Sequence, residues 1–248
     1  MAEPVYDRIS GGYTGGRRPD RRIAAVIWQA LGRAASVVNV GAGTGSYEPA
    51  DRLVVAVEPS PVMAAQRGAG SAPCVRATAE ALPFTDSAFG AAMSVLSLHH
   101  WADKGAGLAE LRRVSRGPVV LFGGFDRQLN TSWWLHDYFP ATRALVSGRT
   151  YPPGLLAVAL GPVTLIPVPI PADCADGFEA AYWRRPAAIL DPAVWRATSA
   201  LALISDSDRN AGLARLAADL ASGAWRSRYG QLLDLDELDL GYRVVVAV

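Results

Sequence analysis

The residues best suited to bind a ligand are three alternating glycines and an acid that follows them. Gly41, Gly43 and Gly45 come directly after a short apolar run, and Glu58 ends the next apolar run along the chain. Glycines at this spacing let the backbone turn sharply and approach a ligand where a Cβ atom would collide. A carboxylate beside such a turn can accept hydrogen bonds from both hydroxyls of a ribose. The pattern therefore predicts a ligand that contains a nucleoside, although a glycine turn taken alone also occurs without one.

The same pairing is found in proteins that bind nicotinamide dinucleotides, so the spacing has to separate two kinds of ligand. A dinucleotide site prefers Gly-x-Gly-x-x-Gly followed by a full helix, whose N-terminus holds the pyrophosphate. Here Ser46 stands in place of the last glycine of that motif, and Pro49 interrupts the short stretch before the next apolar run. The spacing therefore favours a ligand without a pyrophosphate, and a nicotinamide-dependent oxidoreductase is the less favoured alternative.

The chain has three histidines, His99, His100 and His136, and histidine is the side chain best suited to act as a base near neutral pH. His99 and His100 directly follow an apolar run, so both are expected beside the glycine turn at the end of a strand. The alternative is that His99 only packs against a ligand while His100 caps the next helix.

The elements that must position these residues follow an alternating pattern in the first half of the chain. Apolar residues recur at helical spacing in two segments, and short apolar runs between and around them read as buried strands. This alternation implies βαβ units and a mainly parallel sheet. The predicted helices cover residues 20–34 and 107–114, and the predicted strands cover 37–40, 53–57, 72–76, 91–96 and 118–122.

The second half of the chain reads as an elaboration of the same domain. Residues 163–170 predict a strand whose Pro167 and Pro169 suit an edge position. Residues 171–240 are mostly helical in pattern, and residues 242–248 are strongly β-prone. Without an internal repeat or a low-complexity linker, residues 1–248 are expected to form a single domain.

Composition excludes several classes of protein. Of the 248 residues, 50% are hydrophobic, yet no run approaches the roughly 18 apolar residues of a membrane helix. The formal net charge is +1, whereas a nucleic-acid-binding protein usually has a large basic excess. Cys74 and Cys174 share no metal-ligand spacing, so no metal is expected. The N-terminus has no secretory pattern, and a reducing cytoplasm is the expected location.

Four motifs in the first half of the chain occur together in one known family. They are residues 37–48, Val57-Glu58-Pro59-Ser60, residues 79–84 and residues 94–103. In this order they resemble class I S-adenosylmethionine-dependent methyltransferases of the type 11 group, over about residues 6 to 125. The resemblance implies a Rossmann-like α/β fold, with a mostly parallel seven-stranded sheet, an antiparallel last strand and helices on both faces.

The resemblance also implies that S-adenosylmethionine lies across the strand ends. The glycines would back its methionine portion, Glu58 would bind the ribose, and Met63 would cover the adenine. Residues 1–19 resemble a segment that folds over the cofactor, the alternative being a flexible tail. The implied cofactor-binding residues are Tyr13, Arg18, Gly41, Ala42, Gly43, Gly45, Glu58, Pro59, Ser60, Met63, Thr78, Ala79, Glu80 and Leu96.

The expected reaction is methyl transfer to a small molecule, with a hydroxyl of a secondary metabolite as the favoured acceptor and N- or C-methylation as alternatives. In the family's strand order Asp126 would lie beside His99 and His100, and His99 would act as the base with Asp126 orienting it. Residues 125–160 and 171–240 are expected on the acceptor side. Their aromatic residues, among them Trp133 and Trp183, either line an acceptor cavity or form core. The alternative function is binding S-adenosylmethionine without methyl transfer, as a cyclisation catalyst or a regulator.

Overall fold

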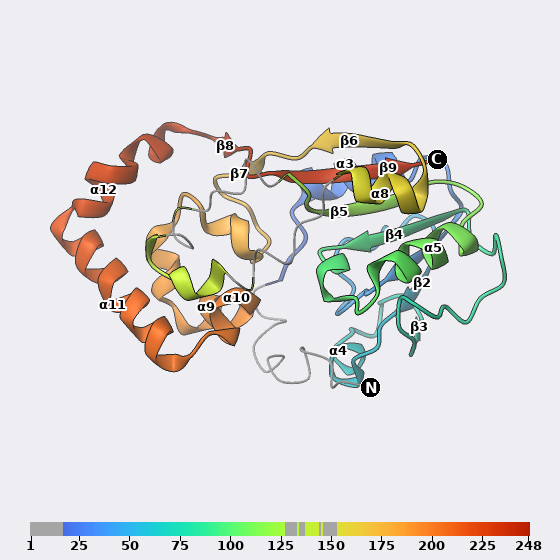
Figure 1. Ribbon diagram of the computed structural model, residues 1–248, viewed down its shortest axis with the longest axis horizontal. Coiled ribbons are helices and arrows are strands. Elements are labelled where there is room, and N and C mark those ends of the chain that lie inside the picture. The colour runs from blue at the N-terminus through green and yellow to red at the C-terminus, as the bar shows by residue number, and fades with distance from the viewer. Residues whose placement is uncertain (1–16, 127–132, 134–136, 144, 146–152) are drawn as a thin grey trace.

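Figure 1 shows the computed structural model of the chain, which describes residues 17–126, 133, 137–143, 145 and 153–248. A seven-stranded sheet lies at one end of the molecule, and a group of helices lies at the other end. In the order in which they lie side by side, the strands are β3 (Cys74–Val75), β2 (Leu53–Val57), β1 (Ser36–Val40), β4 (Ala91–Val95), β5 (Val119–Gly124), β9 (Tyr242–Ala247) and β6 (Val163–Pro167).

The sheet is parallel except at one strand. Strands β1 to β5 pair in parallel, and β9 runs antiparallel between β5 and β6. Parallel neighbours require crossover connections; α4 (Pro61–Ala65) lies in the connection from β2 to β3 and α5 (Lys104–Val114) in that from β4 to β5, whereas residues 46–52 connect β1 to β2 by turns. The prediction of a mostly parallel seven-stranded sheet with an antiparallel last strand is confirmed.

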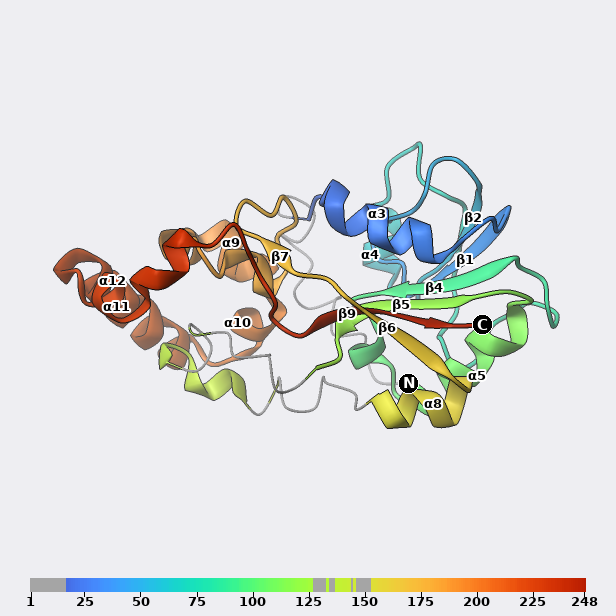
Figure 2. The ribbon, with the colours of Figure 1, turned by 90° about the horizontal axis from the view of Figure 1, so that it is seen from above.

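Helices cover both faces of the sheet (Figure 2). On one face, α3 (Arg21–Ala30) buries Ile23 and Ile27 against strand residues such as Phe122. On the other face, α5 (Lys104–Val114) and α8 (Pro153–Leu160) pack over the neighbouring strand residues, among them Leu121. Residues 121 and 122 point to opposite faces because side chains alternate along a strand, and both faces are therefore apolar.

The helical region, defined here as residues 171–240, lies beside the carboxyl ends of the parallel strands (Figure 1). It is joined to the sheet by one continuous cluster of buried side chains that includes Phe122 of β5, Trp183 and Trp225. Its elements are η4 (Glu179–Tyr182), η5 (Pro186–Leu190), α9 (Pro192–Ala197), α10 (Ser199–Leu203), α11 (Asp206–Ser222), α12 (Ala224–Tyr229), η6 (Gly230–Asp234) and β8 (Glu237–Leu238).

The strand predicted over residues 163–170 is wrong in its extent. Strand β6 ends at Pro167, and a separate short strand, β7 (Ile170–Pro171), pairs with β8 of the helical region. Proline lacks the N–H that a ladder needs, so the strand stops where two prolines fall close together. The edge position predicted for this strand is confirmed, since β6 is the last strand of the sheet.

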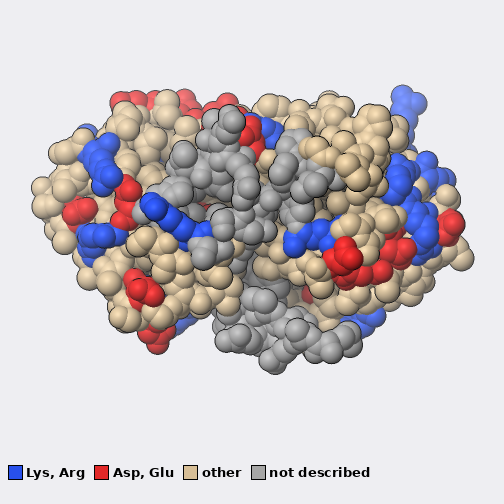
Figure 3. All heavy atoms as spheres, in the orientation of Figure 1, with Lys and Arg blue, Asp and Glu red and all other residues tan. Residues whose placement is uncertain are grey.

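Two further features concern the surface. Figure 3 shows acidic and basic side chains interspersed on the described part of one face of the molecule. In the ranges that the structure describes, no helix is both long and apolar enough to cross a membrane.

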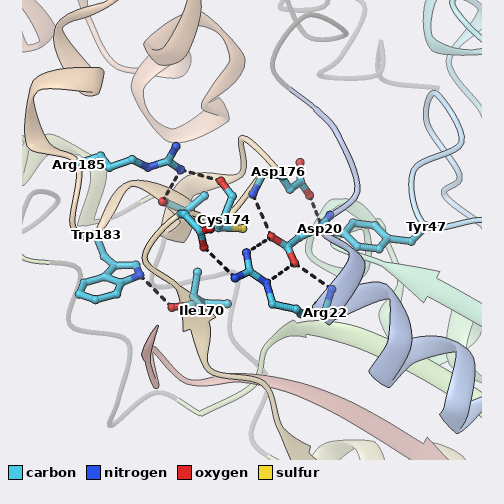
Figure 4. Close-up of polar contacts among 11 residues, drawn as sticks. Asp20, Arg22, Tyr47, Ile170, Cys174, Asp176, Trp183 and Arg185 are labelled. Carbon is cyan, nitrogen blue, oxygen red and sulfur yellow. Dashed lines mark hydrogen bonds and ion pairs between the residues drawn. The ribbon is translucent and has the colours of Figure 1, made fainter. Parts of the chain in front are cut away.

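Asp20 joins the first helix to the helical region (Figure 4). It caps α3 by accepting the N–H of Arg22 at 3.0 Å, and its other oxygen accepts the N–H of Ala175 at 3.0 Å. The Arg22 guanidinium, with these N–H groups, holds the pKa of Asp20 well below its usual range. The carboxylate is 2% exposed, so it anchors α3 and a segment 155 residues away through a single buried group.

We expect Asp20→Ala to lower the free energy of unfolding by about 2 kcal/mol, because a helix cap is lost and the Ala175 amide is left unpaired. A carboxylate with a lowered pKa stabilises the folded state above about pH 4, and this stabilisation is lost as the pH falls. Urea unfolding at several pH values measures both effects. The difference between wild type and variant should shrink from about pH 5 to about pH 2; a difference that does not change with pH would contradict this role.

Candidate functional site

A pocket lies at the carboxyl ends of β1, β2 and β4, at the edge of the sheet that faces the helical region. Ligands of open α/β sheets bind at this edge, where loops diverge above the strand ends. The described residues that line the pocket are Arg17, Asn39, Gly41, Ala42, Gly43, Thr44, Ser46, Glu58, Pro59, Met63, Thr78, Ala79, Glu80, Val95, Leu96, Ser97, His100, Trp101 and Ala102.

The carboxylate of Glu58 is fixed at the centre of this edge. One oxygen accepts the N–H of Gly43 at 2.8 Å, and the other accepts the N–H of Ser60 at 2.9 Å. The residue is 5% exposed. Each oxygen of an ionised carboxylate has about two lone pairs, so an oxygen that accepts one backbone N–H can accept a second hydrogen bond. Two backbone N–H groups therefore hold the Glu58 carboxylate in one orientation at the pocket wall.

The floor of the pocket depends on the close packing of Gly41. Its φ is +69°, and a Cβ at this position would lie 1.7 Å from the Ser97 Oγ. That hydroxyl in turn accepts the indole N–H of Trp101 at 3.2 Å. Glycine is thus required at 41 both by the backbone conformation and by the approach of the segment that follows β4.

The start of a short helix and the loop after β3 also line the pocket. Ser60 caps α4 (Pro61–Ala65) by accepting the N–H of Met63 at 3.1 Å, and the Met63 side chain is buried in the pocket wall. Glu80 accepts the N–H of Ala102 at 2.8 Å. Met63 lies against the glycine turn, since a Cβ at Gly43 would be 3.3 Å from the Met63 Cε atom.

The family of this chain follows from its similarity to a family model and to a solved structure. A methyltransferase-domain family model matches residues 38–121. A crystal structure of a proposed methyltransferase from an antibiotic biosynthesis pathway of Anabaena variabilis is 34% identical. The match covers 94% of this chain and 99% of that one, with a TM-score of 0.87. The chain belongs to the class I S-adenosylmethionine-dependent methyltransferases, type 11 group.

More distant structures share the fold of this methyltransferase. A proposed histamine N-methyltransferase from Thermotoga maritima is 22% identical, with a TM-score of 0.53 over 65% of this chain and 84% of that one. The cyclase SpnF is 16% identical, with a TM-score of 0.51 over 98% of this chain and 91% of that one. Among curated protein sequences there is no significant match.

The pocket fits S-adenosylmethionine. Asn39, which is 1% exposed, lines it with an Oδ1 atom that accepts no hydrogen bond from any described residue. This orphaned acceptor beside the glycine turn suits the ammonium group of a methionine portion. Glu58 suits the ribose, and the apolar wall at Met63 suits the adenine. Residues 46–52 form turns rather than a helix, so the pyrophosphate site of a nicotinamide dinucleotide is missing from this methyltransferase.

The predicted cofactor residues differ in how they are placed. Gly45 does not line the pocket, and a Cβ at this position would meet the side chains of Glu48 and Arg67. Ser60 is fully buried, where it caps α4. Arg17 lines the pocket in place of its neighbour Arg18, while Tyr13 lies outside the described residues. The predicted residues that do line the pocket are Gly41, Ala42, Gly43, Glu58, Pro59, Met63, Thr78, Ala79, Glu80 and Leu96.

Five lining residues with polar side chains are absent from the predicted cofactor residues: Arg17, Asn39, Thr44, Ser46 and Ser97. Asn39 carries a signal, because a polar residue in an otherwise apolar predicted strand needs a partner. The signal for Ser97 is weaker, since a serine after a strand is common. Arg17 lies in a basic pair next to Arg18, and the sequence does not distinguish the two.

A buried ion pair replaces the helix that dinucleotide folds have after the glycine turn. Arg67, at the end of the α4 segment, contacts Glu48 at 2.8 Å and donates to the carbonyl of Gly43 at 3.1 Å. Glu48 also accepts the side-chain N–H of Asn39 at 3.1 Å. Because the side chains of Arg67 and Glu48 are 5% and 9% exposed, this network is well shielded from water. It holds the glycine turn in place without a packed helix.

We expect Arg67→Lys to lower the free energy of unfolding by about 1–2 kcal/mol, although the charge is kept. A lysine ammonium is a point charge and does not reproduce the planar fork that reaches Glu48, Gly43 and Ala72 together. Thermal unfolding measured with and without S-adenosylhomocysteine tests this. An unchanged unfolding temperature in both conditions would contradict the role given to Arg67.

The predicted catalytic residues lie at the same end of the sheet. His100 lines the pocket, and the ring of His99 lies 3.9 Å from the ring of His100, centroid to centroid. Asp126 follows β5 and forms an ion pair at 3.1 Å with Arg243, a buried residue of β9. That Asp126 orients His99 stays a prediction. His136 lies outside the described residues.

Most of the aromatic side chains considered for an acceptor cavity form core instead. Trp133 and Trp183 are 7% and 1% exposed, and their indole N–H groups donate to the carbonyls of Trp183 and Ile170. Trp101 lines the cofactor pocket itself. Arg184 and Arg185 donate to backbone carbonyls within the helical region. In the described part of the chain no group of three His, Cys, Asp or Glu could hold a metal ion.

Proposed function

We propose that this methyltransferase transfers a methyl group to a hydroxyl of a small molecule, with His99 as the general base. The observation that carries the proposal is the position of the two imidazoles directly after β4. His100 lines the cofactor pocket, and the ring of His99 lies against the ring of His100. A neutral imidazole at this edge can take the proton that an alcohol or phenol loses as its oxygen is methylated.

In this proposal the pocket holds S-adenosylmethionine with its ribose at Glu58 and its adenine near Met63. When bound, S-adenosylmethionine supplies a methyl group already activated on a sulfonium, so alignment of the acceptor can provide much of the acceleration. His99 would add proton removal to this alignment. Arg243 pairs with the Asp126 carboxylate just after β5, and in this proposal Asp126 would orient His99.

The acceptor class is supported from outside the pocket. The 34% identical protein is described as a methyltransferase of an antibiotic biosynthesis pathway, and antibiotics are secondary metabolites, which supports a secondary metabolite as the acceptor. A formal net charge of +1 favours a small molecule over a nucleic acid.

The state of the cysteines supports a reducing cytoplasm as the location. Cys74 and Cys174 form no disulfide. Burial raises the pKa of the Cys174 thiol to about 12, so this thiol stays protonated and unreactive.

The test is transfer from S-adenosylmethionine labelled in its methyl group to a panel of phenols, sugar alcohols and amines of similar size. The proposal predicts labelled methyl ethers. Label found only on amines or carbon would contradict the general-base role of His99. If the protein bound the cofactor but labelled no acceptor, the alternative function of binding without methyl transfer would be favoured. The cyclase SpnF shares only its fold with this chain and does not by itself support that alternative.

A further inference from the structure

A fully buried acid of the helical region contacts the cofactor side of the molecule. Asp176 is 0% exposed and lies between η4 and the short strand β7, in a segment that meets the start of α3 (Figure 4). Its two oxygens accept the guanidinium of Arg17 at 2.7 and 3.2 Å, and one of them also accepts the Tyr47 hydroxyl at 2.9 Å. Both partners come from more than 120 residues earlier in the chain, and both adjoin the pocket.

The partners of Asp176 belong to the glycine-turn end of the pocket. Arg17 lines the pocket, and Tyr47 directly follows the lining residue Ser46. Burial, with the neighbouring charge of Asp176, raises the pKa of Tyr47, so its hydroxyl stays protonated and donates. A buried carboxylate is costly unless it is paired and hydrogen-bonded, and here both requirements are met by these two residues.

The paired geometry restricts how Arg17 can lie. A guanidinium held by two parallel hydrogen bonds has a fixed plane, whereas an arginine side chain without such a partner loses rotamer freedom when it binds a ligand. The side chain of Arg17 is 8% exposed, so the ion pair is shielded from water. Asp176 thus holds a cation in one orientation at the wall where the glycine turn lies.

We propose that Asp176 is a positioning residue for the amino-acid end of the cofactor: it fixes Arg17 so that the guanidinium faces the carboxylate of the methionine portion. This inference rests on the proposed binding of S-adenosylmethionine in the pocket. Because Asp176 belongs to the helical region, cofactor binding and the placement of that region become linked, and each stabilises the other.

Two effects of removing the Asp176 charge oppose each other. Without the negative charge of Asp176 beside it, Arg17 would attract a ligand carboxylate more strongly, whereas an Arg17 no longer held by Asp176 must be ordered again when the ligand binds. Positioning predicts that the second effect wins, because the Arg17 side chain then has to leave other contacts and lose rotamer freedom. The sign of the change in affinity therefore separates the two possibilities.

The experiment is calorimetric titration of the full chain with two ligands that share the thioadenosine portion and differ in the amino-acid end, whose carboxylate Arg17 would contact. S-adenosylhomocysteine carries the amino-acid end, and 5′-methylthioadenosine lacks it. Asp176→Asn should weaken S-adenosylhomocysteine about tenfold and change methylthioadenosine less than about twofold. Asp173→Asn is the matched control, since Asp173 lies in the same segment, pairs with Arg22 and is 81% exposed; it should change neither ligand.

Equal weakening of both ligands by Asp176→Asn would overturn the proposal, as would unchanged or tighter binding of S-adenosylhomocysteine. If that variant does not fold, Tyr47→Phe removes one hydrogen bond from the same carboxylate and should weaken S-adenosylhomocysteine alone, by about two- to fivefold. No change there would equally overturn it. A wild-type chain that binds neither ligand would instead show that the cofactor assignment of the pocket is wrong.

Discussion

Replacing His99 by glutamine should slow methyl transfer by about 10²–10⁴-fold while leaving cofactor affinity unchanged. Glutamine keeps much of the size and hydrogen-bonding capacity of the imidazole, so the packing against His100 should be largely preserved. What is lost is the group that accepts the proton of the acceptor hydroxyl. Since only the neutral imidazole can do this, the wild-type rate should also rise as the pH is raised.

The measurement is single-turnover transfer at saturating cofactor, with an acceptor from the labelled-methyl assay. His100→Gln is the matched comparison, because His100 lines the cofactor pocket and its loss should change cofactor binding as well as rate. Asp126→Asn should give a smaller loss of rate than His99→Gln if the carboxylate orients His99. A near-wild-type rate for His99→Gln would leave alignment as the mechanism and make an amine or an activated carbon the better acceptor.

Glu58→Ala should weaken the binding of S-adenosylhomocysteine by roughly 10- to 150-fold, a loss of about 1.5–3 kcal/mol. The carboxylate is expected to accept two ribose hydroxyls. It also holds the N–H groups of Gly43 and Ser60, so its removal loosens both sides of the ribose position. Both effects act in the same direction, and neither can be made up by solvent in a pocket residue that is 5% exposed.

Calorimetry on the folded variant measures this loss. Glu237→Ala is a suitable control, because Glu237 is an exposed glutamate of β8 away from the pocket, and its removal should leave affinity unchanged. Thermal unfolding without ligand shows how much of the effect is lost stability. If folded Glu58→Ala bound S-adenosylhomocysteine as tightly as wild type, the ribose would have to lie elsewhere.

The parts of the site that sequence analysis predicted are encoded by neighbouring residues. The glycine turn and Glu58 follow two adjacent apolar runs, and parallel pairing of β1 and β2 brings them together. His99 and His100 follow the next strand of the sheet in the same way. Each of these residues can be placed once the strands are recognised, because all parallel strands end at one edge.

The parts that could not be predicted depend on distant pairs of residues. Arg17 and Asp176 are 159 positions apart, and local spacing does not indicate that they meet. Gly45 fits the motif, but its contacts with Glu48 and Arg67 depend on the loop after α4. The burial of Trp133 and Trp183 depends on how the helical region folds back, and their types alone suit a core or a cavity equally well.

A crystal structure with S-adenosylhomocysteine bound tests the account most directly. We expect the ribose hydroxyls on the Glu58 carboxylate, the adenine against Met63, the amino-acid end beside the glycine turn and Arg17, and the sulfur on the side of the pocket that His100 lines. A ligand whose ribose lies away from Glu58, or whose sulfur faces away from His99 and His100, would contradict the account.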